Sequence, residues 1–445
     1  MRIATRFSAF LCALLVVSVA SVYSFAIDSD QLPAGSIHGL HVKSDSQLNR
    51  VHSKQGNIPT PHGFPQGIDT IVNFTHHFEA PGVYLDGSPH HVWEYSMVGN
   101  DPAKGGTTVF NAPVIPVTVD LRNADGSPRF AVNQFGQTVR LIDAPDNFVQ
   151  PFLNGPVFGV ANYSSSPVPT QVTDAIQRAE FGSHARADWH TLLAPTVKAA
   201  RKSVVLNRGQ YLWGFRGDGS CCVVLADADF WNNQFAVTTP TPDNSSVVGA
   251  AEVNGDITTK DISTFLFPDT YLYTEHNPAH CCVLGFHTID FEPGDASNGN
   301  RLKFYVLNYS SWISPGVFAD PACGAPGGDG LNCFQDITAN SHEIAETFND
   351  PFVGFDNIHN ITPWWQSGGP GGQCQPLMED GDVIEVLNNA TVPVTIGGVT
   401  YHPQTEALLP WFEFQKNSMA IDGAYSYPNE NTLTQLSAPQ NVGCN

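Results

Sequence analysis

The stretch LNCFQDITANSHEIAETFNDP, from Leu331 to Pro351, is the segment around which the rest of the sequence is best interpreted. Small and apolar residues recur in it at the spacing of one helical face, about 100° per residue: Phe334, Ile337, Ser341, Ile344 and Phe348. Pro351 cannot continue a helix, and the glycines before Leu331 indicate a loop. We therefore expect one helix here, with these residues forming its buried face.

A second face of this helix carries His342, Glu343 and Glu346. His342 and Glu346 are four residues apart, so they lie on adjacent turns and are able to bind one metal ion together. In His-Glu-x-x-His metallopeptidases the outer pair binds zinc and the second residue is the general base. Here a carboxylate replaces the last histidine, which lowers the selectivity for zinc over manganese, iron or calcium. The alternative is a polar helix face exposed to solvent.

A second acidic segment, QCQPLMEDGDVIEV at Gln373–Val386, follows the helix in the sequence. A ligand on a turn around Gly381 would be able to approach the helix face from across a cleft. We therefore predict Glu379 as the remaining metal ligand, with Asp382 ranked second and Asp350 third. The alternative is an ordinary acidic turn.

The composition indicates a loop-rich globular protein. Only 14% of the 445 residues are charged, and the chain contains 39 glycines and 33 prolines. This balance is typical neither of a helical bundle nor of a disordered chain. The net charge of −22 argues against nucleic acid and anionic membranes as partners.

The first 26 residues have the pattern of a secretory signal peptide. Arg2 and Arg6 precede an apolar run, and Ser24 and Ala26 place small residues before a cleavage site. We expect a secreted, extracellular protein. Six Asn-x-Ser/Thr sequons predict that it is a glycoprotein: Asn73, Asn162, Asn244, Asn308, Asn360 and Asn389.

The remaining chain divides into two parts. Residues 27–65 are polar and lack apolar periodicity, which indicates an extension or a propeptide. Residues 66–445 are expected to form a single large mixed domain. An N-terminal β-rich subdomain that ends at about residue 165 is the alternative.

Eight of the nine cysteines remain after the signal peptide is removed, and an even number in an exported protein predicts disulfides. Cys221–Cys222 and Cys281–Cys282 are adjacent pairs in strand-like runs. Since neighbouring residues of a strand point to opposite faces, we expect the members of each pair to bond different partners. A Cys323–Cys333 bridge would close a glycine-rich loop and brace the entrance of the motif helix.

Five strand-like runs between Ser203 and Ile313 precede the motif helix. A helix within Thr170–Leu193, broken near Gly182, and a hairpin at Gly397–Gly398 are also expected. The order of elements predicts an α+β or α/β fold in which the motif helix packs on a mixed β-sheet, as in zincins.

Several blocks of the sequence resemble a family of secreted bacterial and fungal proteins whose reaction is not established. The blocks are WEYSMVG, FNAPVIPVTVDL, TDAIQRAEF, WHTLL, CCVLGFH, SHEIAETFNDPF and the acidic motif from Glu379 to Asp382. The HE-x-A-E stretch with its following Asp-Pro is also similar, more faintly, to the exordium-like, phosphate-induced proteins of plant cell walls. The zincin likeness implies that His342 and Glu346 are ligands, that Glu343 is the base, and that Glu379 or Asp382 completes the site.

These observations predict a secreted metallohydrolase, a zinc-dependent peptidase-like enzyme acting on a peptide or protein. Calcium and manganese are the alternative ions. The second functional class is a non-catalytic extracellular protein of the exordium-like type, a pseudo-enzyme that binds a cell-wall component.

Overall fold

The computed structural model describes residues 30–32, 66–81, 90–237, 239, 241–318, 333–353, 364–365, 374–375, 378–385, 387–413 and 415–436. The predicted signal peptide and most of the polar extension lie outside this part of the chain. In the described residues, no helix is both long enough and apolar enough to cross a membrane.

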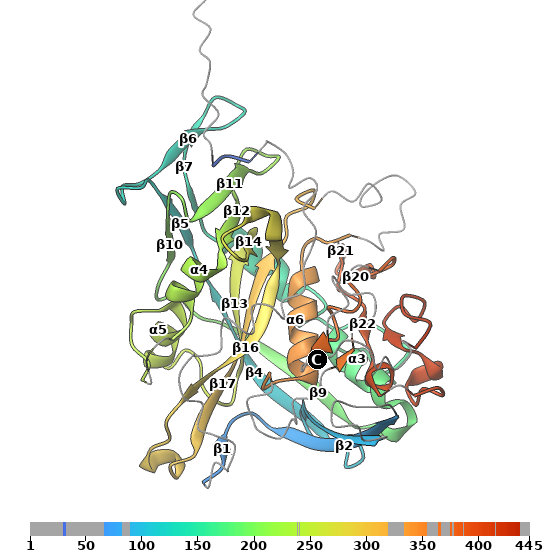
Figure 1. Cartoon of the computed structure of the whole chain (residues 1–445). Helices are drawn as coiled ribbons and strands as arrows, with labels where there is room; N and C mark the ends of the chain where they lie inside the picture. Colours follow the sequence, from blue (N-terminus) through green and yellow to red (C-terminus); the bar gives the residue numbers. More distant parts are fainter. Residues whose placement is uncertain are drawn as a thin grey trace, which may run out of the picture.

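A six-stranded mixed sheet forms the centre of the fold (Figure 1). Its strands are β1 (Ile68–Asp69), β4 (Thr107–Pro116), β9 (His190–Val197), β13 (Ile262–Pro268), β16 (Gly285–Glu292) and β17 (Leu302–Trp312). All neighbours are parallel except β16, which pairs antiparallel with β17. Every residue of β13 is buried, as expected of a parallel strand whose two faces are both covered.

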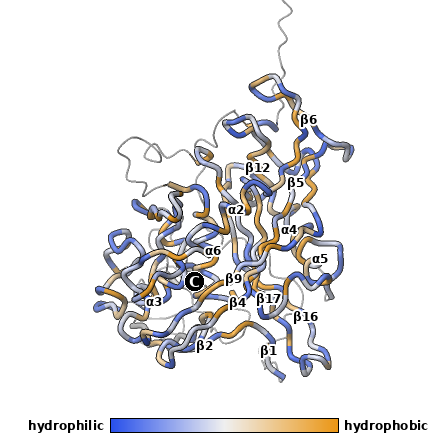
Figure 2. The backbone as a smooth tube through the Cα atoms, turned by 180° about the vertical axis from the view of Figure 1, so that it is seen from behind, coloured by the Kyte–Doolittle hydropathy of each residue, from blue (hydrophilic) through white to orange (hydrophobic). Residues whose placement is uncertain are grey.

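Helices cover both faces of this sheet (Figure 1). On one face lie α3 (Val172–Phe181) and α6 (Thr338–Asn349), which pack with Leu266 and Val306. On the other lie α4 (Ala228–Phe235) and α5 (Val247–Val253), which pack with Phe265 and Leu307. Since successive strand residues point to opposite faces, the apolar runs of β13 and β17 supply both cores. Hydrophobic segments gather in these central strands (Figure 2).

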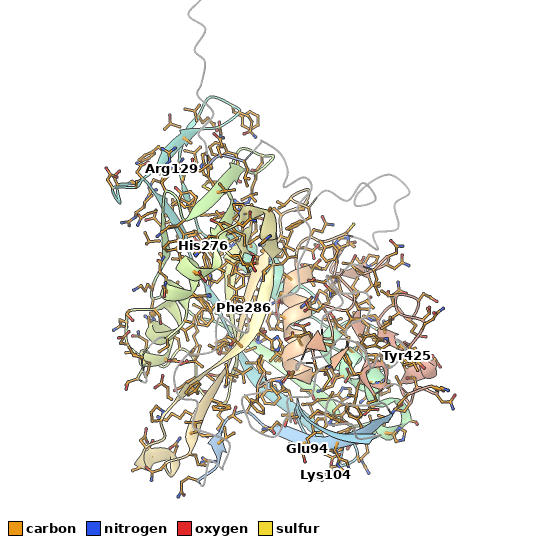
Figure 3. All side chains as sticks on the ribbon, viewed as in Figure 1. Glu94, Lys104, Arg129, His276, Phe286 and Tyr425 are labelled. Carbon is orange, nitrogen blue, oxygen red and sulfur yellow. A yellow bond between two sulfur atoms is a disulfide. The ribbon has the colours of Figure 1, made fainter. Side chains whose placement is uncertain are left out.

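A second group of strands continues the face that α4 covers. One sheet contains β11 (Tyr211–Phe215), β12 (Cys221–Asp227), β14 (Thr270–Tyr273) and β15 (Cys281–Val283). Another contains β5 (Val119–Arg122), β8 (Ile142–Asp143) and β10 (Val204–Asn207). Phe286 on β16 stacks on Tyr309 of β17 with ring centroids 4.9 Å apart, which joins the central sheet to this core (Figure 3).

Smaller elements complete the described chain. The paired strands are β2 (Asn73–Pro81) with β3 (His90–Val98), β6 (Phe130–Val132) with β7 (Thr138–Arg140), β18 (Trp364–Trp365) with β19 (Cys374–Gln375), β20 (Val394–Ile396) with β21 (Val399–Tyr401), and β22 (Glu406–Ala407) with β23 (Ser426–Tyr427). Two short helices are α2 (Asp146–Asn154) and α7 (Leu409–Phe412).

The predicted mixed α+β class is confirmed, and so are several local features. The helix α3 ends at Gly182, whose φ of 48° lies in the left-handed region. The hairpin of β20 and β21 turns at Gly397 and Gly398, which both have positive φ. Beyond Gly182 the chain forms only a short 3-10 helix, Gly182–His184, before it enters β9 and pairs with β4.

The motif helix is shorter than predicted. It begins at Thr338 and ends at Asn349, directly before Asp350 and the proline that follows. Residues 333–337 are not helical, because Asp336 has a φ of 48° and pairs through its backbone with Ile313. Phe334 therefore lies before the helix. Its side chain packs against the hydrophobic cluster that contains Ala339 of α6.

The disulfide predictions concern cysteines both inside and outside the described residues. In each adjacent pair the two sulfur atoms lie side by side, Cys221 with Cys222 and Cys281 with Cys282. Pairing with different partners and the bracing Cys323–Cys333 bridge stay predictions. Cys323 lies outside the described residues, while Cys333 is buried beside the start of α6.

Candidate metal centre

The polar face of α6 is buried. His342, Glu343 and Glu346 are 3%, 2% and 0% exposed, although sequence reasoning allowed a solvent-exposed face. The helix packs against β16 and β17, and the acidic turn 378–385 contacts the same polar face through Glu346. Buried charged groups are costly unless they are paired or bind an ion, so this face has a specific role in the fold.

The spacing of four residues brings His342 and Glu346 together, as expected for a helix. Glu346 Oε1 lies 3.1 Å from His342 Nε2, and Asp382 Oδ1 lies 3.9 Å from the same nitrogen. Glu346 Oε1 also accepts hydrogen bonds from the backbone N–H groups of Gly381, at 3.0 Å, and of Asp382, at 3.3 Å. The acidic turn therefore fixes the carboxylate of Glu346 and places Asp382 beside it.

The other ring nitrogen of His342 faces a different carboxylate. His342 Nδ1 lies 3.5 Å from Glu385 Oε1, and the Glu385 side chain is 6% exposed. Histidine ligands of metals characteristically hold their second nitrogen against a carboxylate, which fixes the tautomer and leaves the first nitrogen free to bind. Glu385 thus orients the ring so that Nε2 points at Glu346 and Asp382.

His287 on β16 joins the same cluster, and sequence reasoning missed it. It is 1% exposed, and its Nδ1 lies 3.4 Å from Glu346 Oε2, 3.8 Å from Glu379 Oε2 and 3.9 Å from Glu343 Oε2. The one available signal was a histidine inside the strand-like run CCVLGFHTIDF. Only the pairing of β16 with β17, under α6, brings this residue to the motif.

All five predicted site residues lie in one buried cluster with His287. Asp382 contacts His342, whereas Glu379, ranked first from the sequence, lies beside His287. Asp350 has a different position. It accepts hydrogen bonds from the backbone N–H groups of Val353 and Met378, and so ties the end of α6 to the acidic turn.

The cluster contains more carboxyl groups than histidines. Beside Glu343, Glu346, Glu379 and Asp382 lie three further buried acids, Asp380, Glu385 and Glu406. Burial raises the pKa of each of these three well above its usual range, and neighbouring carboxylates raise it further. Residues 304–415 contain thirteen acidic residues and no lysine or arginine, so histidines are the only cationic side chains that this stretch supplies.

The histidine and carboxylate at the centre shift each other in opposite directions. Burial alone would lower the pKa of His342, but Glu346 and Glu343 raise it well above its usual value. Burial would raise the pKa of Glu346, but His342 and His287 hold it well below its usual range. Both shifts have the same cause, the close approach of an imidazole and a carboxylate away from water.

Two glycines let the backbone approach the cluster closely. A Cβ atom on Gly381 would lie 2.6 Å from His342 Nδ1, and one on Gly285 would lie 2.5 Å from Glu343 Oε1. Neither glycine has a positive φ, so close approach rather than turn geometry requires glycine at these positions. The backbone at Gly285 and Gly381 therefore packs directly against the Glu343 carboxylate and the His342 ring and confines them.

The donor set fits a divalent metal ion. His342, Glu346 and Asp382 each offer one ligand atom, and these atoms all lie within 4.8 Å of one another. Imidazole nitrogen with carboxylate oxygen suits zinc, manganese or iron, and the carboxylates alone would also suit calcium. No family model, curated protein or solved structure matches this chain, so the interpretation of the site depends on its geometry.

Proposed function

We propose that the protein is a metal-dependent hydrolase, of the zinc peptidase-like kind, whose ion is held by His342, Glu346 and Asp382. The observation that supports this most directly is the geometry of His342. Its Nε2 faces two carboxylates at 3.1 and 3.9 Å while Glu385 holds its Nδ1. This is the arrangement of a metal-binding histidine with its orienting carboxylate.

The charge of the cluster supports the same proposal. Carboxylates removed from water are stable when a cation lies among them, and the histidines of the cluster supply at most one positive charge each. A divalent ion at Nε2 of His342 would offset the charges of Glu346 and Asp382 together. The proposal thus explains why so many acids are buried in a segment without lysine or arginine.

In this proposal the ion and Glu343 share the chemistry of hydrolysis. A bound zinc ion would polarise a substrate carbonyl and lower the pKa of a bound water to about 7. Glu343 is the proton carrier in this proposal, because its Oε1 lies 4.0 Å from His342 Nε2 and so faces the position where the ion is bound. Glu379 belongs to the same buried cluster, with its Oε2 3.8 Å from His287 Nδ1.

Elemental analysis of protein that has never been exposed to a chelator tests whether a metal ion is bound. We expect at least one zinc, manganese or iron ion per chain, and one ion fewer in a His342→Gln variant. A digest of an unbiased peptide library by the same preparation then tests hydrolysis. Absence of stoichiometric metal from the wild-type protein would overturn the proposal.

A non-catalytic extracellular protein with a structural ion is the second candidate. The observation that favours it is burial, because every donor group of the cluster is shielded from solvent. In this case the ion stabilises the contact between α6 and the acidic turn. Stoichiometric calcium together with no cleavage of the peptide library would support this function over the first.

A further inference from the structure

Two groups of ligand-type side chains share Glu346. One group is His342, Glu346 and Asp382, and the other is His287, Glu343 and Glu346. In each group the three ligand atoms lie within 4.8 Å of one another, and all five residues are buried. We propose that the cluster binds two divalent metal ions, with the carboxylate of Glu346 bridging them.

The two oxygens of Glu346 face different histidines. Oε1 lies 3.1 Å from His342 Nε2, and Oε2 lies 3.4 Å from His287 Nδ1. A carboxylate that offers one oxygen to each of two ions is a bridging ligand, and paired ions in hydrolases lie about 3.5–4 Å apart. Each position then has one imidazole, one carboxylate of its own and one oxygen of Glu346.

The shared ligand is held rigidly. The backbone N–H groups of Gly381 and Asp382 both donate to Glu346 Oε1, so two hydrogen bonds restrain the carboxylate. The ligands come from β16, α6 and the acidic turn, which are packed elements and not free loops. Sites of this kind keep their geometry better than sites on mobile segments.

Glu343 has one oxygen at each position. Its Oε2 lies 3.9 Å from His287 Nδ1, and its Oε1 lies 4.0 Å from His342 Nε2. One oxygen therefore binds the second ion while the other remains directed at the first position. The proton-carrying role of Glu343 in the proposed function is compatible with this arrangement.

The second ion also accounts for the amount of buried acid. A single divalent ion among seven carboxyl groups and two histidines leaves a large negative excess. Two ions supply four positive charges and so leave a smaller negative excess among the buried carboxyl groups. The inference depends on the proposed function for its first ion and adds the second.

Native mass spectrometry of wild type and variants, each loaded with Mn²⁺ or Zn²⁺ and then desalted, counts the ions. The double variant His287→Gln/His342→Gln gives the baseline, which includes any ion bound elsewhere on the chain. We expect wild type to exceed this baseline by two ions, and each single variant to exceed it by one. His190→Gln, which changes a histidine paired with Asp174 away from the cluster, is the control and should exceed it by two.

Electron paramagnetic resonance of the Mn²⁺-loaded protein tests the bridge itself. Two ions joined by Glu346 are expected to give the spectrum of an exchange-coupled pair, and His287→Gln the spectrum of an isolated ion. One ion above the baseline in wild type would overturn the second site and leave the proposed function intact. No ion above the baseline would overturn both.

Discussion

Adding one methyl group at Gly381 tests whether the turn 378–385 is shaped around the His342 ring or is an ordinary acidic turn. A Cβ atom at Gly381 would lie 2.6 Å from the His342 ring, and the ring cannot move away without losing Glu346 or Glu385. We expect Gly381→Ala to lower the free energy of unfolding by about 1–3 kcal/mol and to weaken metal binding at least tenfold.

The control for this change is Gly217→Ala. Gly217 has open space around the position of a Cβ atom and no positive φ, so alanine there is expected to be neutral. Chemical denaturation and metal titration of both variants measure the difference. Equal behaviour of the two would show that Gly381 does not shape the cluster.

Glu343 is the residue that carries the chemistry in the proposed function. Glutamine keeps the shape of its side chain but does not accept a proton. Glu343→Gln is therefore expected to reduce peptide hydrolysis by about 10²–10⁴-fold. The ion held by His342, Glu346 and Asp382 should remain, as elemental analysis would show.

The matched control is Glu275→Gln. The Glu275 side chain is 71% exposed and pairs with His280, which is not part of the cluster. The rate of hydrolysis by this variant should equal that of the wild type. Undiminished turnover in Glu343→Gln would remove this residue from the mechanism.

At the same scale, the sequence predicted only what is local. The spacing of His342 and Glu346 follows from helix geometry alone, so their contact was predictable. The position of His287 was not predictable in this way. It lies far from the motif in the sequence, and its place beside Glu346 depends on how β16 pairs with β17. The sequence ranked Glu379 above Asp382 and did not indicate that the backbone N–H groups of Gly381 and Asp382 donate to Glu346.

At the scale of elements, tertiary contacts decide where α6 begins. Asp336 accepts hydrogen bonds from the backbone N–H groups of Ile337 and His402 and lies 2.7 Å from His402 Nδ1. Thr338 Oγ1 donates to the backbone carbonyl of His402. These contacts hold residues 333–337 out of the helix, whereas apolar spacing alone predicted that Phe334 would belong to it.

We expect Asp336→Ala to lower the free energy of unfolding by about 2–3 kcal/mol. The substitution removes the acceptor for three buried groups and places alanine at a φ of 48°, which strains an L side chain. Asp336→Asn keeps an acceptor and tolerates the left-handed conformation, so it should cost less. Urea denaturation measures both, and equal losses would contradict this explanation.

At the scale of the whole molecule, residues 30–32 pack against the end of the fold that carries β6 and β7. Both carboxylate oxygens of Asp30 accept hydrogen bonds from Arg129, which lies at the end that carries β6 and β7 (Figure 3). The backbone N–H of Leu32 donates to the carbonyl of Trp213 on β11. Residues 30–32 therefore belong to the folded structure, although composition placed them in a polar extension or propeptide.

Asp30→Ala is expected to lower the free energy of unfolding by about 3–5 kcal/mol, because it leaves the Arg129 guanidinium buried without its bidentate partner. The double variant Asp30→Ala/Arg129→Met should recover part of this loss, since methionine buries no charge. Thermal unfolding compares the three proteins. A single variant as stable as wild type would show that the segment is not anchored by this pair.

Two buried acids outside the metal cluster make the stability of the whole molecule depend on pH. Burial raises the pKa of Glu413 to about 8 and that of Glu180 to about 8. In the unfolded chain both groups return to ordinary values near 4.5. Between these values the folded state binds more protons than the unfolded state, so stability falls as the pH rises from about 4.5 to about 8.

Glu413→Gln isolates one of these contributions. Glutamine is neutral at every pH and its carbonyl oxygen still accepts the hydrogen bond from Gln415, so the variant does not lose a buried proton. Relative to wild type, it should therefore differ little at pH 4.5, gain thermal stability as the pH rises from about 4.5 to about 8, and keep a constant advantage above that. Unfolding temperatures at pH 4.5, 6, 8 and 9, with the exposed Glu275→Gln as control, measure this gain. A difference between wild type and Glu413→Gln that does not change with pH would mean that Glu413 is ionised in the folded protein throughout.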